Sequence, residues 1–222
     1  HSQYQHGMTG LPYELIINSD PCISYLMLEN PLYLQILIMA HCVGHSDFFK
    51  MNRNFSFTRA DTIVPRMRNA KKRIQAYCED PHIGIDKVEE LIDACHAISY
   101  QVPRYPMDIP NLPEQYEQYR LDNLQKVNKN RVYARDLPYK PEYDLLGFCA
   151  AYGEHKEEWE KDVIEIVRDS AYYFMPQIRT KTMNEGWACF WHYKILHELD
   201  LPQGLHLPFL KSHNQVVRPH IG

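Results

Sequence analysis

Two histidines, His41 and His45, lie four residues apart in the segment AHCVGHSDFF, at the end of an apolar run. If this segment is helical, both rings share one face and point their nitrogen atoms at a common position, as zinc ligation requires. The spacing matches the zinc-binding pattern His-Glu-x-x-His, but Cys42 stands where that pattern has its general base. The pair predicts a metal site without an identified proton-transfer group; the alternative is two hydrogen-bonded core histidines.

A second segment, TMNEGWACFWHYKIL, places Glu185, Cys189 and His192 at positions i, i+4 and i+7 of a predicted helix. The three side chains then lie on one face. A carboxylate on an otherwise aromatic and aliphatic helix is costly to bury unless it is paired or bound to a cation. Glu185 is therefore a candidate metal ligand from a second helix. The alternative is a buried carboxylate that accepts a hydrogen bond from a tyrosine, arginine or histidine.

A third pair, Asp93 and His96, stands three residues apart in EELIDACHAISY. The two residues could be the carboxylate–histidine pair of a metal site in a helical bundle, or Asp93 could orient His96 for ligation or proton transfer. A solvated pair at a helix edge is an equally good interpretation. Glu14 and His213 are also polar residues in an apolar context, and each taken singly is interpreted as structural.

These candidates lie in segments whose apolar residues repeat with a helical period. In PLYLQILIMAHCVGH, apolar residues and both histidines share one face, with Pro31 in the first turn and Asn30 as a candidate N-cap. Another helix follows Gly84, with Asp86 placed to cap it. The remaining predicted helices span 62–79, 157–174 and 183–199. Pro176 is expected to end the second of these. The segment after residue 200 shows no strong hydrophobic period. The predicted fold class is mainly α, with few or no strands.

Residues 101–145 differ in character from the rest of the chain. Six prolines flank a polar segment, EQYEQYRLDNLQKVNKNRVYAR, and such a density of proline interrupts regular structure. We interpret this region as a loop-rich insertion. The whole chain, residues 1–222, is expected to form a single domain, because its length is sufficient for one sizeable core.

The composition narrows the classes of function. The chain has 45% hydrophobic and 23% charged residues and a formal net charge of −4, so it has no general positive field for nucleic acid, and we expect no nucleic-acid partner. No apolar run approaches the roughly 20 residues of a transmembrane helix, so no membrane span is expected. The six cysteines include no C-x-x-C pair, which favours reduced thiols.

Several long segments together resemble one known family, the stage V sporulation protein R (SpoVR-like) family. The resemblance rests on YELIINSDPCISYLMLEN, AHCVGHSDFFKMN, VEELIDACHAISY, MNEGWACFWHYKIL and FLKSHNQVVRPHIG. It implies a bacterial cytoplasmic protein associated with formation of the spore cortex. Family members usually continue beyond RPHIG, so the chain is expected to be truncated at its C-terminus.

A second resemblance concerns motifs only. NEGWA is similar to the segment in which gluzincin aminopeptidases supply their third zinc ligand, a glutamate. The resemblance implies a zincin-like domain in which His41, His45 and Glu185 bind zinc or another divalent transition metal. This chain departs from the pattern at Cys42, and the two halves lie about 140 residues apart.

The missing glutamate leaves the general base to be assigned. His192 and His96 are the favoured candidates, while Glu14 and Asp47 are less favoured. Cys42 could instead be a metal ligand or a redox-sensitive thiol.

Three hypotheses about function follow from these observations. The leading one is a metal-dependent hydrolase acting on a peptide, amide or cell-wall-related bond. A second is a di-metal redox protein in which Asp93, His96, Glu185 and His192 join the His41/His45 pair. A third is a non-catalytic metal-binding, regulatory or scaffold protein that acts through a protein partner.

Overall fold

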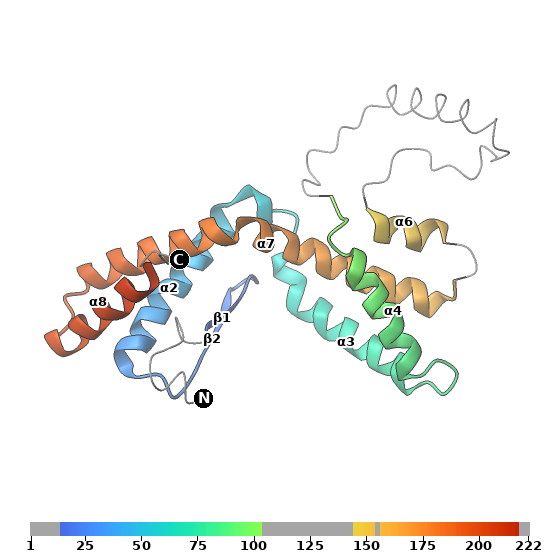
Figure 1. Ribbon diagram of the computed structural model, residues 1–222, viewed down its shortest axis with the longest axis horizontal. Helices are drawn as coiled ribbons and strands as arrows, with labels where there is room; N and C mark the ends of the chain where they lie inside the picture. The colour runs from blue at the N-terminus through green and yellow to red at the C-terminus, as the bar shows by residue number, and fades with distance from the viewer. Residues whose placement is uncertain (1–13, 104–143, 154–155, 218–222) are drawn as a thin grey trace, which may run out of the picture. The chain divides into compact units, whose positions relative to one another are not determined.

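The computed structural model describes residues 14–103, 144–153 and 156–217. Within these residues the chain is mainly helical, as predicted, and has one two-stranded sheet (Figure 1). The strands are β1 (Glu14–Ile17) and β2 (Ile23–Leu26). The α-helices are α2 (Leu32–Met51), α3 (Ile63–Glu79), α4 (Ile85–Ile98), α6 (Leu145–Tyr152), α7 (Glu158–Glu198) and α8 (Gln203–Val217), with short 3-10 helices at Arg53–Phe55 and Ala60–Thr62.

Three helix predictions need correction. The predicted helix end before Pro176 is wrong, because α7 continues through this residue. Pro176 is fully buried, so the packing of its ring offsets the backbone hydrogen bond that proline cannot donate. The segment after residue 200, which showed no period, forms α8. Finally, α2 begins at Leu32 with Pro31 as its N-cap, one residue later than expected, and Asn30 does not cap it.

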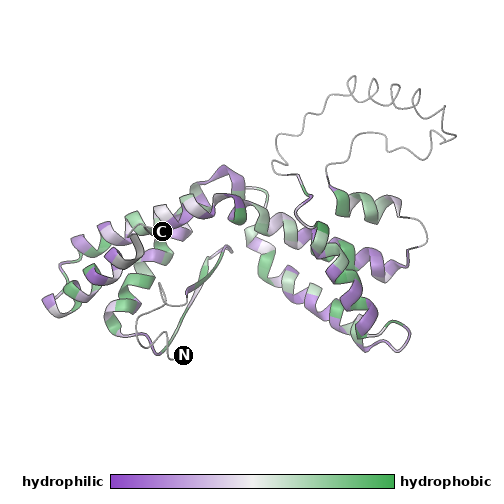
Figure 2. Ribbon diagram, viewed as in Figure 1, coloured by the Kyte–Doolittle hydropathy of each residue, from purple (hydrophilic) through white to green (hydrophobic). Residues whose placement is uncertain are grey.

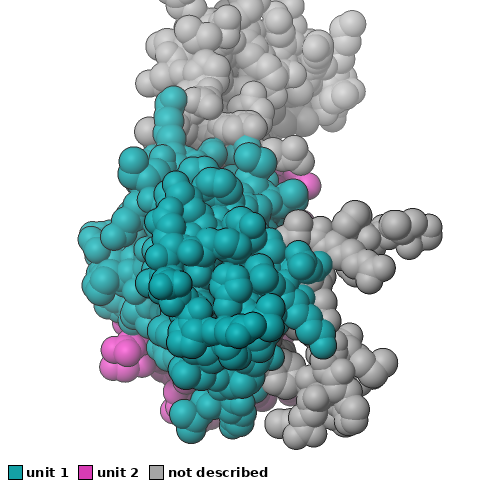
Figure 3. Space-filling view, turned by 90° about the vertical axis from the view of Figure 1, so that its left-hand side faces the viewer, with its two compact units in different colours: residues 1–66, 177–222 teal, residues 67–176 magenta. Residues whose placement is uncertain are grey.

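The chain divides into two compact units, residues 1–66 with 177–222 and residues 67–176, coloured separately in Figure 3. The first unit contains β1, β2, α2, α8 and the C-terminal part of α7. The single domain over residues 1–222 stays a prediction. Most of the predicted insertion at 101–145 lies outside the described residues.

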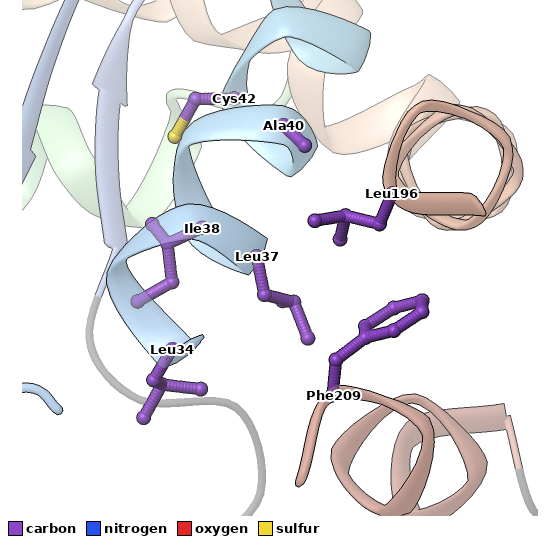
Figure 4. Packing of buried hydrophobic residues seen from close by; sticks show 7 residues of the cluster. All are labelled: Leu34, Leu37, Ile38, Ala40, Cys42, Leu196 and Phe209. Atoms are coloured by element: carbon purple, nitrogen blue, oxygen red, sulfur yellow. The ribbon is translucent and has the colours of Figure 1, made fainter. Parts of the chain in front are cut away.

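The core of the first unit is formed where α2, α7 and α8 meet. Leu37 of α2, Leu196 of α7 and Phe209 of α8 are each fully buried and point toward one another (Figure 4). Leu34, Ile38, Ala40 and Cys42 complete the cluster from α2. This packing fixes α2 against the C-terminal half of α7, the two helices that carry the histidines and Glu185 identified in the sequence.

The β1–β2 hairpin covers a second side of α2. Its antiparallel register pairs Glu14 with Leu26 and Ile16 with Ser24. Alternate residues of a strand point to opposite faces, and Ile16 packs against the α2 core while Leu15 is 56% exposed. Glu14 therefore shares the inward face with Ile16, and its carboxylate points toward α2.

The second unit has its own small core. Cys95 of α4, Leu146 of α6, and Ile164 and Val167 of α7 form its buried cluster, and α6 is mostly green in the hydropathy colouring of Figure 2. The buried Asp144 caps α6 by accepting a hydrogen bond from the Gly147 backbone. No helix in the described part of the chain is both long and apolar enough to cross a membrane.

Candidate metal centre

A glycine sets the distance between α2 and α7. Gly44 packs directly on Ala188, where a Cβ atom added to the glycine would lie 2.7 Å from the Ala188 Cα atom. The contacts run in opposite directions along the two helices, since His41 faces His192 and His45 faces Asn184. Because the crossing lies within one turn of both histidines, it brings the NEGWACFWH segment against the AHCVGH segment.

Four side chains converge beside this crossing. The Nε2 atom of His41 lies 3.3 Å from Glu14 Oε1 and 3.5 Å from Glu185 Oε2. The Nε2 atom of His45 lies 3.4 Å from Glu14 Oε1 and 3.9 Å from Glu185 Oε2. One donor atom from each of the four residues lies within 4.8 Å of every other. Two imidazoles and two carboxylates thus surround one position.

The two histidines hold their Nε2 atoms toward this position through contacts of the opposite ring nitrogen. His45 Nδ1 lies 2.9 Å from Asn184 Oδ1. An amide oxygen only accepts hydrogen bonds, so Nδ1 of His45 carries a proton, and Nε2, which faces the two carboxylates, is the nitrogen that would bind a metal. A metal-binding histidine typically donates its second N–H in this way.

His41 is oriented by a chain of histidines. Its Nδ1 atom lies 2.9 Å from Nδ1 of His192, and Nε2 of His192 lies 2.7 Å from Nδ1 of His213 on α8. His41 and His192 are fully buried. The sequence of contacts allows each ring to donate one hydrogen bond to the next, which leaves the His41 Nε2 atom facing Glu14 and Glu185.

Buried charge dominates the electrostatics of the four residues. Burial alone would raise the pKa of Glu14, but electrostatic attraction to His41 and His45 outweighs it and lowers this pKa to about 2. Burial alone would lower the pKa of His41, but Cys189, Glu14 and Glu185 outweigh it and raise this pKa to about 11. In the absence of a metal, a protonated His41 therefore balances part of the carboxylate charge.

The His41 Nε2 atom is nevertheless poorly satisfied as a hydrogen-bonding group. It is buried and has no partner with hydrogen-bond geometry, although both carboxylates are close enough for charge attraction. Ligands of one tetrahedral zinc, with bonds of roughly 2.0–2.1 Å, are separated by about 3.3 Å. The observed separations of 3.3 to 3.9 Å are close to this spacing. A divalent cation at this position would satisfy the His41 Nε2 atom, which the present contacts leave without a hydrogen-bond partner.

Cys42 occupies the position of the missing glutamate and faces the hairpin. Its Sγ atom lies 4.0 Å from Glu14 Oε2, and Figure 4 shows its side chain pointing away from Leu196. Burial, followed by the charge of Glu14, raises the pKa of the Cys42 thiol to about 11. The thiol is therefore protonated near neutral pH and unsuited to act as a general base.

The structure brings together the three residues that the sequence assigned to the metal, His41, His45 and Glu185. His192, predicted as a general base, lies behind His41 and contacts its Nδ1 atom. His96 is exposed on α4 in the second unit, as is Asp93. Neither His96 nor Asp93 belongs to a metal-binding group within the described residues.

Sequence reasoning missed Asn184, considered Glu14 only as a less favoured base, and interpreted His213 as structural. Glu14 lies on a strand of only four residues, which is too short for its alternation to identify an inward-facing carboxylate. Asn184 directly precedes Glu185, and only the position of His45 gives it a role. His213 had one available signal, a polar residue in the apolar segment FLKSHNQVV, but the helix that carries it was not predicted.

Comparisons with known proteins show which family the chain belongs to. A family model described as SpoVR like protein matches residues 1–222. Uncharacterized protein YcgB of Escherichia coli (strain K12) is 41% identical over 237 aligned residues, which cover 96% of this chain and 46% of that protein. The chain thus spans less than half the length of this relative. No solved structure matches the chain. The match to the family model over the whole chain shows that it belongs to the SpoVR-like family.

Proposed function

We propose that this part of the protein is a metal-dependent hydrolase centre, in which His41, His45 and Glu185 hold a divalent transition metal, zinc in the simplest case. The observation that carries the proposal is the convergence of the two Nε2 atoms and two carboxylates on one position, with His41 Nε2 buried and without a hydrogen-bond partner. Two carboxylates also neutralise a divalent cation, which makes such a charge tolerable at a largely buried site.

Glu14 is the best candidate for the general base that Cys42 does not supply. Its Oε1 atom lies beside both Nε2 atoms, and its side chain is 17% exposed. When bound, the cation would supply a Lewis acid that polarises a scissile carbonyl and acidifies an attacking water. Glu14 would take the proton of this water and pass it to the leaving amine. Glu185, whose side chain is 47% exposed, marks the side open to a peptide or cell-wall-related substrate.

His192 is better placed as a positioning residue than as a base. It is fully buried, and both ring nitrogens already contact other histidines, His41 and His213. It can therefore hold the ring of His41 in the orientation that ligation needs. His96 is kept only as a sequence-based candidate, because no contact of the described residues links it to the four converging side chains.

A closed, non-catalytic metal site is the second candidate. It is favoured by one observation, the separation of Glu14 Oε1 from the two Nε2 atoms, which are 3.3 and 3.4 Å away. This is the separation expected for two ligands of the same tetrahedral ion. With Glu14 as fourth ligand, no coordination position remains open for a substrate, and a structural or regulatory role follows.

Metal analysis of the purified protein tests both candidates. We expect at least one equivalent of metal in the wild type and none in a His41→Ala/His45→Ala variant. Equal metal content in the two proteins, or none in the wild type after gentle purification, would contradict the proposed centre. A panel of fluorogenic peptides and soluble cell-wall fragments then serves as substrate, and hydrolysis by the wild type is expected to disappear in the same double variant.

Glu14→Gln separates the base from the fourth ligand. If Glu14 is the base, this variant retains the metal content of the wild type with similar affinity but loses hydrolysis by about 10²–10⁴-fold. If Glu14 is a ligand, metal affinity itself falls steeply. Glu89→Gln, on the exposed face of α4, is the matched control and should change neither property.

The remaining proposals rest on the family resemblance alone. We retain a bacterial cytoplasmic location, an association with the spore cortex and a protein partner as proposals, because no contact in the described residues bears on them. The two-metal redox alternative that uses Asp93 and His96 is less favoured, since both are exposed on α4. Iron or manganese at two equivalents, lost in a His96→Ala variant, would revive it.

A further inference from the structure

A second group of metal-ligand side chains lies on the other side of His41. One donor atom each from His41, Cys189 and His192 lies within 4.8 Å of the others. The Nδ1 atoms of His41 and His192 face each other at 2.9 Å, whereas the first group uses Nε2 of His41. The two groups share the His41 imidazole, whose Nε2 atom faces Glu14 and Glu185 and whose Nδ1 atom faces His192.

We propose that this second group is a separate binding site for a thiophilic divalent cation, such as zinc, with His41 bridging it to the hydrolase centre. Its ligands are Nδ1 of His41, Nδ1 of His192 and Sγ of Cys189. The site shares His41 with the proposed hydrolase centre, but it does not require that centre to be catalytic.

The arrangement of the ligands along α7 supports this assignment. Cys189 and His192 are three residues apart, so they lie on one face of the helix, and that face meets α2 at the Gly44–Ala188 contact. Two tetrahedral zinc ligands are about 3.3 Å apart. The two Nδ1 atoms would have to separate by only about 0.4 Å from their observed 2.9 Å, a shift that side-chain rotation can supply.

The outer contacts of His192 are those of a metal-binding histidine. Its Nε2 atom lies 2.7 Å from Nδ1 of His213. If Nε2 carries the ring proton and donates it to His213, Nδ1 is left with the lone pair that a metal needs. His192 is fully buried, and Cys189 is only partly so, which gives the cation a route from solvent through the thiol.

The donor sets of the two sites predict different metal preferences. The first site offers two nitrogens and carboxylate oxygens, while the second offers two nitrogens and one sulfur. Thiolate ligands favour zinc, cadmium and other thiophilic ions over magnesium, calcium or manganese. A metal that cannot bind thiolate would therefore fill the first site only.

Charge balance is consistent with occupation of both sites. Binding of the second cation would release the thiol proton of Cys189 and the remaining ring proton of His41 to solvent, which leaves a thiolate and a bridging imidazolate. With the carboxylates of Glu14 and Glu185, these groups carry four negative charges, which balance two divalent cations. A neutral cluster avoids the large cost of an uncompensated charge next to fully buried side chains.

Cobalt titration of the metal-free protein tests the proposal, because Co²⁺ bound to thiolate absorbs in the near ultraviolet and Co²⁺ bound to nitrogen and oxygen alone does not. We expect the wild type to bind two equivalents and to develop the thiolate band. Cys189→Ser should lose the band and one equivalent. Cys78→Ser, a partly buried thiol in the second unit, is the matched control and should keep both.

The other possible outcomes of the cobalt titration show which of the two sites fails. A single equivalent without a thiolate band overturns the second site and leaves the hydrolase centre intact. A band that persists in Cys189→Ser but disappears in Cys42→Ser assigns the sulfur to the wrong cysteine and also overturns it. In His45→Ala, retention of one equivalent with the band supports the second site even if the hydrolase centre fails. Binding of no cobalt overturns both sites.

Discussion

Substitution of Gly44 by alanine should damage the proposed metal centre without changing any of its proposed ligands. The added Cβ atom would lie 2.7 Å from Cα of Ala188 and 3.3 Å from its Cβ. The first distance is about 0.7 Å shorter than the 3.4 Å at which ordinary contact begins. Because the obstructing atom belongs to the backbone of α7, no side chain can rotate away. The two helices must move apart.

That movement exceeds what the ligand geometry tolerates. Metal–ligand distances are held to within roughly 0.2 Å in functional sites, and the separating helices carry His41 and His45 on one side and Glu185 on the other. We expect metal affinity to fall by at least 10–100-fold, the loss seen when the supporting residues of a metal site are removed. The free energy of unfolding should change less. Overpacking destabilises by about 1–3 kcal/mol, and the higher helix propensity of alanine offsets up to about 1 kcal/mol of this.

Gly186→Ala is the matched control for this substitution. Gly186 is an exposed glycine of α7, two residues before Ala188, and a Cβ atom added there meets nothing within 4 Å. This variant should bind metal as the wild type does and gain up to about 1 kcal/mol in the free energy of unfolding. Competition with a chromophoric chelator and urea unfolding measure the two quantities. Wild-type affinity in Gly44→Ala would refute the idea that this helix contact sets the ligand geometry.

Three further predictions test other parts of the site. The pKa of His41 is raised to about 11, and ligation removes the proton concerned. Metal affinity, measured by competition with a chelator, should therefore rise about tenfold per pH unit between roughly pH 6 and 8. An affinity that does not depend on pH would contradict this prediction. The pKa of Glu14 falls from 4.5 to about 2 on folding, so its ionised form stabilises the metal-free protein above about pH 4.5. This stability is lost as the pH falls through about 2. On acidification, the urea midpoint should therefore fall further in the wild type than in Glu14→Gln. Asn184→Ala should weaken metal binding by about 10–100-fold through loss of the His45 contact, whereas Asn184→Asp, which keeps an acceptor oxygen, should bind more tightly than the alanine variant.

Local spacing predicted the half-sites but not their assembly. The i, i+4 relation of His41 and His45, and the helical face shared by Glu185 and His192, are properties of single helices, so they can be read from the sequence. Which helix faces which depends on contacts between residues far apart in the chain. The small residues Gly44 and Ala188 are visible in the sequence, yet nothing local shows that they touch. The resemblance of NEGWA to a known ligand segment supplied that long-range link.

Sequence reasoning placed two elements wrongly, because both depend on packing between distant parts of the chain. At Pro176 the local rule predicts a helix end, because proline lacks an N–H, but burial of the residue outweighs that rule. In α8, Phe209 is the one residue described as buried, so the helix carries almost no periodic hydrophobic signal. As a result, the helix that presents His213 to His192 was not predicted.

The carboxylate of Glu14 lies beside the two histidines although it is far from them in the sequence. Residue 42 directly follows His41, so on a helix its side chain points about 100° away from the ring, toward the hairpin. There the Cys42 thiol meets Glu14, at 4.0 Å from Sγ to Oε2. A glutamate at position 42 would place a second carboxylate against Glu14 in a largely buried environment, where like charges strongly disfavour ionisation. A small, neutral side chain at position 42 is therefore what allows the carboxylate of β1 to approach both histidines. The absence of the usual glutamate thus does not argue against proton transfer at this site, because Glu14 lies where a base would be needed.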